Sequence, residues 1–416
     1  MARLPQSRLP RVMRFGISAM MRFIGAQNNA FPYNNFALSG FIEMSHFLIF
    51  NVIMKSGRIF LSLLAFFGVS PVFGQAPKYS NEFLSIGVGA RALGMSNSVV
   101  ASVDDATASY WNPAGMLGIK TDAQIGLMHA EYFAGIAKFD YGGFAKRIDS
   151  NSVFGFSIIR FGVDDIPNTI DLIDPSGNID YDRISTFSSA DYAFIFSYAR
   201  RTKIPGLDIG ANFKIIHRKV GDFGRSWGFG LDASAIYKTK GWIFGANFRD
   251  VTTTFNAWSY SLTDQMIDVF NQTGNEIPDN TLEITMPRLL LGAARKFYIQ
   301  ENKKVSIMTE LDLDVTFDGK RNTLIKSNFG SIDPHLGIEA GFRDLVFLRT
   351  GLGNFQKSIK IDGSGEELTF QPNIGFGVRL KKFTIDYALT DIGDQSVSLY
   401  SHVFSLKFDI TKPTMK

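Results

Sequence analysis

The sequence predicts an all-β protein, a transmembrane antiparallel β-barrel of about 14 strands with an N-terminal hatch in its lumen. Three observations lead to this prediction. Residues 121–410 form a series of segments, each roughly ten residues long, in which apolar and polar side chains alternate. Short and long connections between these segments alternate along the chain. Residues 83–116, which precede them, are rich in glycine and other small residues and poor in strand formers.

The composition narrows the class of protein. The chain has 416 residues and no interior linker rich in Pro, Ser or charge, so we expect one large unit. It contains 39 glycines, 39 phenylalanines and no cysteine. Without cysteine we expect no disulfide framework, no thiolate metal site and no lipoprotein anchor. The net charge of +4 is accounted for by basic residues among the first 58 and does not indicate a nucleic-acid partner.

The N-terminal residues divide into two parts. Residues 1–53 show no pattern that continues into the rest, and we interpret them as a misassigned extension or one removed with the signal. Residues 54–74 have a basic start, an apolar stretch at 59–69 and a small-residue cleavage site, which indicate a Sec-type signal peptide. An uncleaved anchor is the weaker alternative, because the stretch is too short to span about 30 Å of bilayer. The hatch would then comprise residues 75–118 and the barrel 119–416.

Each predicted strand has one apolar and one polar face. In residues 304–315, Val305, Ile307 and Leu311 fall on one face, whereas charged side chains such as Asp312 fall on the other. Lipid on one side and a wet lumen on the other require this pattern. A soluble sandwich alternates too, because one face of each of its sheets packs on a core. Alternation alone therefore leaves both architectures open.

The connections favour the barrel. Short turns follow every second strand, as at 148–150 and 202–206, whereas the connections between them are on average much longer, as at 163–188 and 251–285. Barrels of the outer membrane show this pattern, with the short turns at the periplasmic rim. An even strand number places both ends of the barrel at that rim, where we expect the hatch to enter. The segments predicted as strands are 121–130, 137–147, 151–162, 189–201, 207–219, 226–238, 242–250, 286–297, 304–315, 332–342, 345–353, 371–380, 383–390 and 399–410.

Aromatic residues lie near the ends of many predicted strands. The last strand, 400–410, resembles the C-terminal signal that the barrel-assembly machinery reads, although residues 411–416 follow it. Barrels place such rings in two girdles at the membrane interfaces. The alternative is that strands are aromatic-rich everywhere. The residues predicted for the girdles are Tyr132, Phe133, Tyr192, Tyr198, Trp227, Tyr237, Trp242, Tyr387 and Tyr400.

The lumen-facing positions hold most of the charge. We expect these groups to pair with each other or with the hatch rather than to form a substrate site. Glu310 and Asp312 have no histidine or third ligand nearby in sequence, so neither a metal site nor acid–base catalysis is predicted there. The charged residues predicted to face the lumen are Asp191, Lys214, Asp232, Arg249, Arg288, Glu310, Asp312, Asp314, Glu339, Arg349, Arg379, Asp386 and Lys407.

Motifs for chemistry are weak or absent in the sequence. Gly87-Val88-Gly89 lacks the spacing of a dinucleotide fingerprint and is not followed by the Lys-Ser/Thr of a phosphate loop. The five histidines are scattered, and no Ser-His-Asp arrangement is apparent. We therefore predict no catalytic, cofactor-binding or metal-binding residue, and no enzyme.

Residues of the hatch have physical roles of their own. Glycines permit close backbone approach in a packed plug, and proline biases the preceding asparagine toward an extended backbone. Arg91 is expected to pair with lumen carboxylates, and Asp104-Asp105 to cap a short helix over 106–110. The alternative, an ordinary strand-turn-helix segment leading into the barrel, implies no function. The candidate hatch residues are Gly89, Arg91, Gly94, Asp104, Asp105, Asn112, Pro113 and Ala114.

Residues 89–95 (GARALGM), 103–106 (VDDA) and 111–115 (WNPAG) together resemble the N-terminal region of the PorV/PorQ family of outer-membrane proteins. More distantly, the segment is similar to the FadL-type fatty-acid channels, which share an Asn-Pro-Ala in their hatch. The resemblance implies a fourteen-strand barrel with an N-terminal hatch, tied to the type IX secretion system. Gly89 and Gly115 depart from the PorV pattern, which usually has an acidic residue at the first position and a basic residue at the second. The resemblance therefore does not identify the cargo.

Two functions remain. The first, implied by the resemblance, is a type IX secretion component that binds translocon or attachment-complex proteins and secreted cargo through its long loops. Those loops mix apolar and acidic residues, as a binding surface does. The second is a FadL-like outer-membrane transporter of hydrophobic small molecules. A porin is less favoured because the hatch would block its lumen. The loop residues predicted to bind partners are Trp258, Tyr260, Met266 and Phe270.

Overall fold

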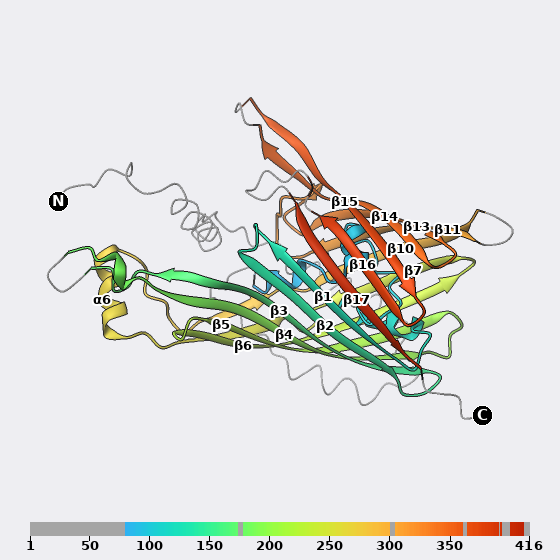
Figure 1. Cartoon of the computed structure of the whole chain (residues 1–416), viewed down its shortest axis with the longest axis horizontal. Coiled ribbons are helices and arrows are strands. Elements are labelled where there is room, and N and C mark those ends of the chain that lie inside the picture. The colour runs from blue at the N-terminus through green and yellow to red at the C-terminus, as the bar shows by residue number, and fades with distance from the viewer. Residues whose placement is uncertain are drawn as a thin grey trace. The chain divides into compact units, whose positions relative to one another are not determined.

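The computed structural model describes residues 80–173, 178–299, 304–360, 364–390, 392 and 400–411. In these residues fourteen strands form a closed antiparallel barrel, in which each strand is hydrogen-bonded to the next and the last to the first (Figure 1). The predicted fold class and strand number are confirmed. The predicted extension (1–53) and signal peptide (54–74) lie outside the described residues.

The ring strands correspond to the predicted segments. Turns such as 202–206 lie at one end of the barrel, the short-turn rim, and connections such as 169–184 lie at the other, the long-loop rim. In order around the barrel the strands are β1 (Ala123–Tyr132), β2 (Ala137–Arg147), β3 (Ser152–Asn168), β4 (Ser185–Arg201), β5 (Leu207–Val220), β6 (Gly224–Thr239), β7 (Trp242–Arg249), β10 (Arg288–Tyr298), β11 (Val305–Thr316), β13 (Ser331–Phe342), β14 (Val346–Ile359), β15 (Glu366–Leu380), β16 (Phe383–Thr390) and β17 (Ser401–Ile410).

Three further strands lie where loops were predicted. β8 (Thr254–Tyr260) pairs with the part of β6 that extends beyond β7, and β9 (Leu282–Thr285) pairs with β8. Helix α6 (Asp264–Thr273) connects the two, and the short strand β12 (Ile325–Lys326) pairs with β13. The segment 251–285 is therefore mostly regular structure. With β3–β6 it forms an extension at the long-loop rim, seen on the left of Figure 1.

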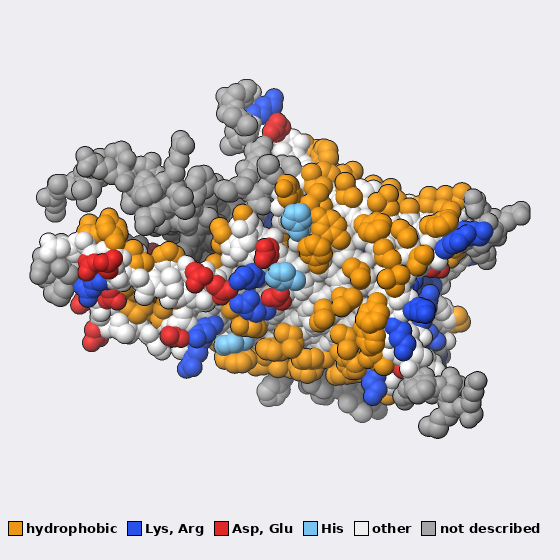
Figure 2. All heavy atoms as spheres, in the orientation of Figure 1, with side chains coloured by type: hydrophobic (Ala, Val, Ile, Leu, Met, Phe, Trp, Pro, Cys, Tyr) orange, Lys and Arg blue, Asp and Glu red, His pale blue; other side chains and the backbone are white. Residues whose placement is uncertain are grey.

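The outward face carries an apolar belt bounded by aromatic residues. On β6, Phe229 and Leu231 point outward between Trp227 and Tyr237, and these four side chains are 42–55% exposed. His217 of β5 stacks on Trp227 with 4.1 Å between ring centroids. Figure 2 shows a band of hydrophobic side chains with charged side chains beyond both of its borders. This surface matches a lipid bilayer with its interfacial girdle and places the barrel in an outer membrane.

No helix in the described part of the chain is long and apolar enough to cross a membrane.

The hatch lies inside the barrel and has a small core of its own. Its elements are the 3₁₀ helix η2 (Glu82–Ser85), helix α4 (Ala90–Gly94), helix α5 (Ala108–Trp111) and the 3₁₀ helix η3 (Pro113–Gly118). Val88, Met95, Val99, Trp111 and Met116 belong to this core, and each is at most 4% exposed.

The described hatch begins near the long-loop rim, so the predicted entry from the short-turn rim is wrong. The Leu84 carbonyl accepts a hydrogen bond from Arg249, which stands at the long-loop end of β7. The Ile119 carbonyl, at the other end of the hatch, accepts one from Arg147 at the short-turn end of β2. Strand parity fixes the ends of the barrel only. It carries no information on a segment that crosses the lumen before the first strand begins.

Candidate functional site

The hatch backbone lies directly against the backbone of the barrel wall, and this contact defines the candidate site. At Gly351 on β14, an added Cβ would lie 2.3 Å from the Met95 carbonyl carbon, and at Gly245 on β7 it would lie 2.5 Å from the Val100 carbonyl oxygen. Only glycine permits this approach. The same close contact involves Gly210, Gly292, Gly337 and Gly375 of the wall and Gly94 of the hatch, which was predicted.

A short repeat in the wall also holds the hatch, and the sequence analysis missed it. The motif Gly-Ala-Asn-Phe followed by a basic residue occurs at 210–214 in β5 and again at 245–249 in β7. Asn212 Nδ2 donates to the Ser109 carbonyl (2.9 Å), and Asn247 Nδ2 donates to the Trp111 carbonyl (2.8 Å). Each copy thus presents one glycine and one amide to the hatch. The repeated motif is the signal, and a search of the sequence for internal repeats would have found these residues.

The predicted Asn112-Pro113-Ala114 motif ties the hatch to itself and to the wall. Asn112 is extended (φ −162°, ψ 98°), as predicted for a residue before Pro113. Its Nδ2 donates to the carbonyls of Val100 in the hatch (2.9 Å) and Ala235 in β6 (3.2 Å). Its Oδ1 accepts from the Ala114 N–H (3.2 Å) at the start of η3. One amide therefore joins two hatch segments to one strand.

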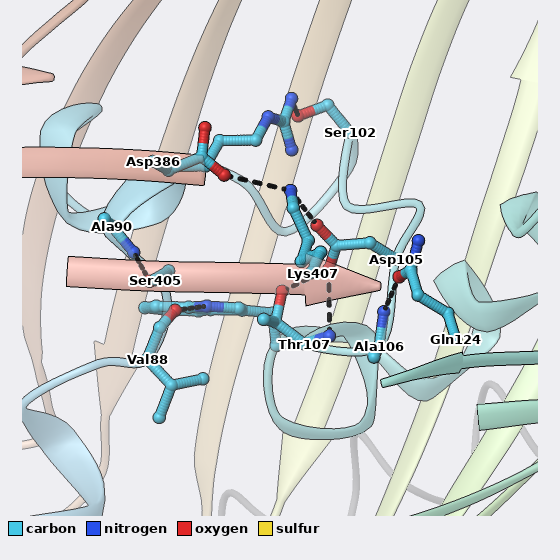
Figure 3. A network of polar contacts seen from close by, with 12 residues as sticks. Val88, Ala90, Ser102, Asp105, Ala106, Thr107, Gln124, Asp386, Ser405 and Lys407 are labelled. Carbon is cyan, nitrogen blue, oxygen red and sulfur yellow. Dashed lines mark hydrogen bonds and ion pairs between the residues drawn. The ribbon is translucent and has the colours of Figure 1, made fainter. Parts of the chain in front are cut away.

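Gly89 turns the chain into helix α4. Its φ of +89° lies in the region that favours glycine. Its N–H points to the sulfur of Met128 on β1, and the next N–H, of Ala90, donates to Ser405 Oγ on β17 (2.7 Å; Figure 3). Beside it, Trp111 Nε1 donates to the Val88 carbonyl (2.8 Å). The turn is thus fixed from both the wall and the hatch.

Six charged side chains form one alternating chain of ion pairs that begins and ends in the hatch. Three cations and three anions take part, so their charges cancel. Successive partners lie 3.0, 2.7, 2.7, 3.2 and 2.8 Å apart. This ion-pair chain runs Arg91, Glu339 (β13), Arg349 (β14), Asp386 (β16), Lys407 (β17) and Asp105. Arg91 thus pairs with a lumen carboxylate, as predicted, and the lumen charges of this ion-pair chain pair with each other and with the hatch.

A glycine lets the ion-pair chain cross one strand of the wall. β15 lies between Arg349 on β14 and Asp386 on β16. An added Cβ at Gly377 of β15 would lie 2.3 Å from Asp386 Oδ1 and 2.6 Å from Arg349 Nη1. Only glycine at this position leaves room for the two side chains to meet.

Asp105 is the hatch anion of the ion-pair chain. Its Oδ2 pairs with Lys407, which lies between Asp105 and Asp386 (Figure 3), and its Oδ1 accepts from the Thr107 N–H (2.9 Å). Burial alone would raise the pKa of Asp105, but the ion pair and hydrogen bond with Lys407 hold it well below 3.8. The helix predicted over 106–110 is α5, which begins two residues later, and Asp104 is exposed.

The half of the lumen nearer the long-loop rim, here called the upper lumen, has an apolar wall on the side away from the ion-pair chain. Phe139 of β2, Ile159 of β3, Ile195 of β4 and Ile216 of β5 are at most 2% exposed. They belong to one apolar cluster with Phe83 of η2. We call these four wall residues the apolar wall.

The spaces between hatch and wall are small. A cavity near the long-loop rim, lined by Arg249, Arg288 and Arg321 among others, has about 40 Å³ of room. Another, beside Lys407, has about 10 Å³. The second holds at most about one water molecule and the first only a few. Within the described residues, no group of three or more His, Asp or Glu side chains is placed to hold a metal ion.

Two of the four loop residues predicted to bind partners are buried. Trp258 is 7% exposed; its ring stacks on Tyr260 with 5.5 Å between centroids, and the Arg218 guanidinium lies over it. Met266, 9% exposed, is on the buried side of α6, and Phe270 is half-buried. Their side chains stabilise the extension from within. Sequence reasoning missed this because it treated 251–285 as a loop.

Comparisons with known proteins give similar folds at low identity. The toluene transporter TbuX of Ralstonia pickettii matches with a TM-score of 0.46 and 14% identity over 78% of this chain and 98% of its own. TodX of P. putida gives 0.46 and 11% over 78% and 99%, and a Pseudomonas aeruginosa FadL homologue gives 0.42 and 14% over 77% and 98%. No protein-family model and no curated protein sequence matches the chain.

We predict that the substitution Gly351→Ala loosens the hatch. The new Cβ would lie 2.5 Å from the Ser96 nitrogen, so the hatch must move, at a cost of about 1–3 kcal/mol. Gly142→Ala is the matched control, because the nearest side-chain atom there is 3.9 Å away, and it should change stability by less than about 0.5 kcal/mol. Urea unfolding in lipid vesicles measures both. Equal stability of the two variants would contradict the contact.

We predict that Asp105→Asn lowers the free energy of opening of the hatch by about 3 kcal/mol at neutral pH. The substitution removes one of the two anionic partners of the buried Lys407. Since the pKa of Asp105 is depressed in the folded state, its contribution is present above pH 3.8 and is lost as pH falls below that value. Hydrogen exchange of residues 88–111 between neutral and acid pH measures this. Asp104→Asn, on the exposed neighbour, should have a much smaller effect.

Proposed function

We propose that this chain carries hydrophobic small molecules across the outer membrane, with the hatch as its gate. The observation that carries the proposal is the apolar wall of the upper lumen, formed by Phe139, Ile159, Ile195 and Ile216. Sites for small apolar ligands are concave and lined mainly by hydrophobic side chains. A water-filled pore has no need of such a wall.

The start of the hatch belongs to the same apolar cluster as the apolar wall. Phe83 is 5% exposed, and Leu84 and Ile86 pack against the same cluster. We propose that displacement of η2, which breaks the Glu82–Arg321 ion pair (2.9 Å), opens an apolar pocket close to the long-loop rim, which faces the outside of the cell. The rest of the hatch would stay fastened to the opposite wall by the ion-pair chain. We infer that ligand enters where η2 now lies.

Passage of a ligand requires motion of the hatch. The two cavities described above, between the described residues of hatch and wall, have room for water only. The wall itself cannot open, because a gap between two strands would leave backbone groups unpaired in lipid. The hatch is thus the movable part.

We predict that cross-linking the hatch to the wall stops transport. The Ser109 hydroxyl of α5 contacts the Ser157 hydroxyl of β3, and the chain contains no cysteine. The variant S109C/S157C should form a disulfide on oxidation. In liposomes containing the wild-type protein we expect uptake of a labelled fatty acid or toluene above that of empty liposomes. Uptake by the oxidised variant should be at least about tenfold slower than uptake by the wild-type protein.

The control is the same variant after reduction, which should regain uptake, together with the two single-cysteine variants. Uptake that persists in the oxidised variant would contradict a gate formed by α5. No uptake by the wild-type protein for either ligand would contradict the proposed function itself.

A second candidate is the role that the PorV/PorQ resemblance implies, a type IX secretion component that binds partner proteins and cargo. One observation favours it. At the tip of the connection between β3 and β4, Ile173, Ile179 and Tyr181 are 60%, 54% and 61% exposed. Gln265 of α6 donates to Asp171 (2.6 Å) and joins this tip to the rest of the extension. Exposed apolar side chains outside the lipid belt are typical of protein-binding surfaces.

We predict for this second candidate that I173S/Y181S reduces the recovery of co-purified outer-membrane partners about tenfold, the loss expected for two interface anchors. Ile148→Ser is the matched control, because Ile148 is 60% exposed at the short-turn rim. Unchanged recovery with both variants would contradict a binding role for the tip.

A further inference from the structure

Hatch residues 98–102 cross the lumen against β11. The backbone N–H groups of Ala101 (2.6 Å) and Ser102 (3.3 Å) donate to Glu310 Oε1. The N–H of Val100 donates to Asp312 Oδ2 (2.9 Å). Two carboxyl groups of one strand therefore hold three successive amides of the hatch.

The two carboxyl groups are close and deeply buried. Glu310 and Asp312 are 1% and 3% exposed, point to the same side of β11 and accept from the adjacent hatch amides of Ala101 and Val100, respectively. Among the described residues, Glu310 Oε2 and Asp312 Oδ1 have no hydrogen-bond partner. Among the ion pairs of the described residues, neither carboxyl group has a lysine or arginine partner. Two ionised carboxylates contain only acceptors, so these two oxygens can satisfy each other only if they share a proton.

Neighbouring charges are engaged elsewhere. Arg91 of the hatch pairs with Glu339 of β13, and Arg288 of β10 pairs with Asp314, the next lumen-facing residue of β11. His335 of β13 is adjacent to Asp312 in the sheet, but its ring is turned toward β14, where an added Cβ at Gly353 would lie 2.5 Å from Nδ1. On the other side of β11, the neighbours on β10 are Gly292 and Ala294.

We propose that Glu310 and Asp312 form a proton-binding site that latches the hatch. One proton is shared between Glu310 Oε2 and Asp312 Oδ1, while the other two oxygens accept from the hatch amides. Loss of this proton places two negative charges side by side in a buried site, and residues 98–102 then separate from β11 so that water can solvate the charges. The site is independent of what the barrel carries.

The sign of the pH effect follows from the proton count. In the open state the carboxyl groups are solvated and ionise near pH 4, so opening above about pH 5 releases the shared proton. Opening then becomes about tenfold more frequent for each pH unit of increase. A buried neutral histidine that became charged on opening would give the opposite slope. The direction therefore distinguishes the carboxyl pair from His335.

Hydrogen exchange of the purified protein in detergent tests the proposal. Protection factors of the Val100, Ala101 and Ser102 amides, corrected for intrinsic exchange, are measured from pH 5 to pH 8. We expect them to fall about tenfold per pH unit in the wild type. In Glu310→Gln they should be flat, because the amide oxygen still accepts from the hatch and the amide nitrogen donates to Asp312 without a titrating proton.

Two further variants keep the test decisive. Asp312→Asn should also be flat, and it replaces Glu310→Gln if the latter does not fold. Glu339→Gln breaks the ion-pair chain, so it should lower protection at every pH and keep the slope. A flat wild-type profile, or a slope that persists in both carboxamide variants, would overturn the proposal.

Discussion

The contact between two backbones is the constraint on which the rest of the structure depends. Glycines such as Gly245 and Gly351 allow the hatch main chain to lie on the strands with no side chain between. Water cannot reach polar groups in such a contact, so each buried N–H and C=O of the hatch needs a partner in the wall or in the hatch itself. Lumen-facing amides and carboxylates supply those partners, as Asn212, Asn247 and Glu310 do. The close backbone contact thus requires both the glycines, which make room for it, and the polar lumen side chains, which supply hydrogen-bond partners.

The hatch is held differently on its two sides. Toward β11–β17 it is fixed by directional contacts, the ion-pair chain and the carboxyl pair. Toward β2–β5 it packs on the apolar wall and makes hydrogen bonds without an ion pair, such as that of Asn212 with the Ser109 carbonyl. A buried ion pair adds little net stability compared with apolar packing, but removing one partner is costly. The ion-pair chain therefore fixes the position of the hatch, whereas the apolar wall holds it without ion pairs.

Much of the barrel could be predicted from the sequence, because a strand between lipid and a lumen must alternate. In β11, for example, the predicted lumen-facing Glu310, Asp312 and Asp314 are all buried. β8 and β9 were missed because strands of seven and four residues on either side of a helix give no sustained alternation. The burial of Trp258 was missed for the same reason. The path of the hatch and its partners depend on contacts between residues far apart in the chain, which no local pattern encodes.

The wall limits what the protein can do. Each of the fourteen strands is hydrogen-bonded to both neighbours, and opening that ring in lipid would expose unpaired backbone groups. Any change of state must then occur in the hatch. The two candidate functions make opposite demands on it: transport needs η2 to leave the apolar wall, whereas a partner-binding barrel needs the hatch to stay. The carboxyl pair lies on the fixed side, against 98–102, so losing its proton would free the segment that the ion-pair chain and Asn112 otherwise hold. Motion of η2 alone would leave that segment in place, and a ligand could enter the upper lumen without completing its passage. Under the transport proposal, entry from outside and release toward the periplasm would thus be separate steps, governed by opposite sides of one hatch.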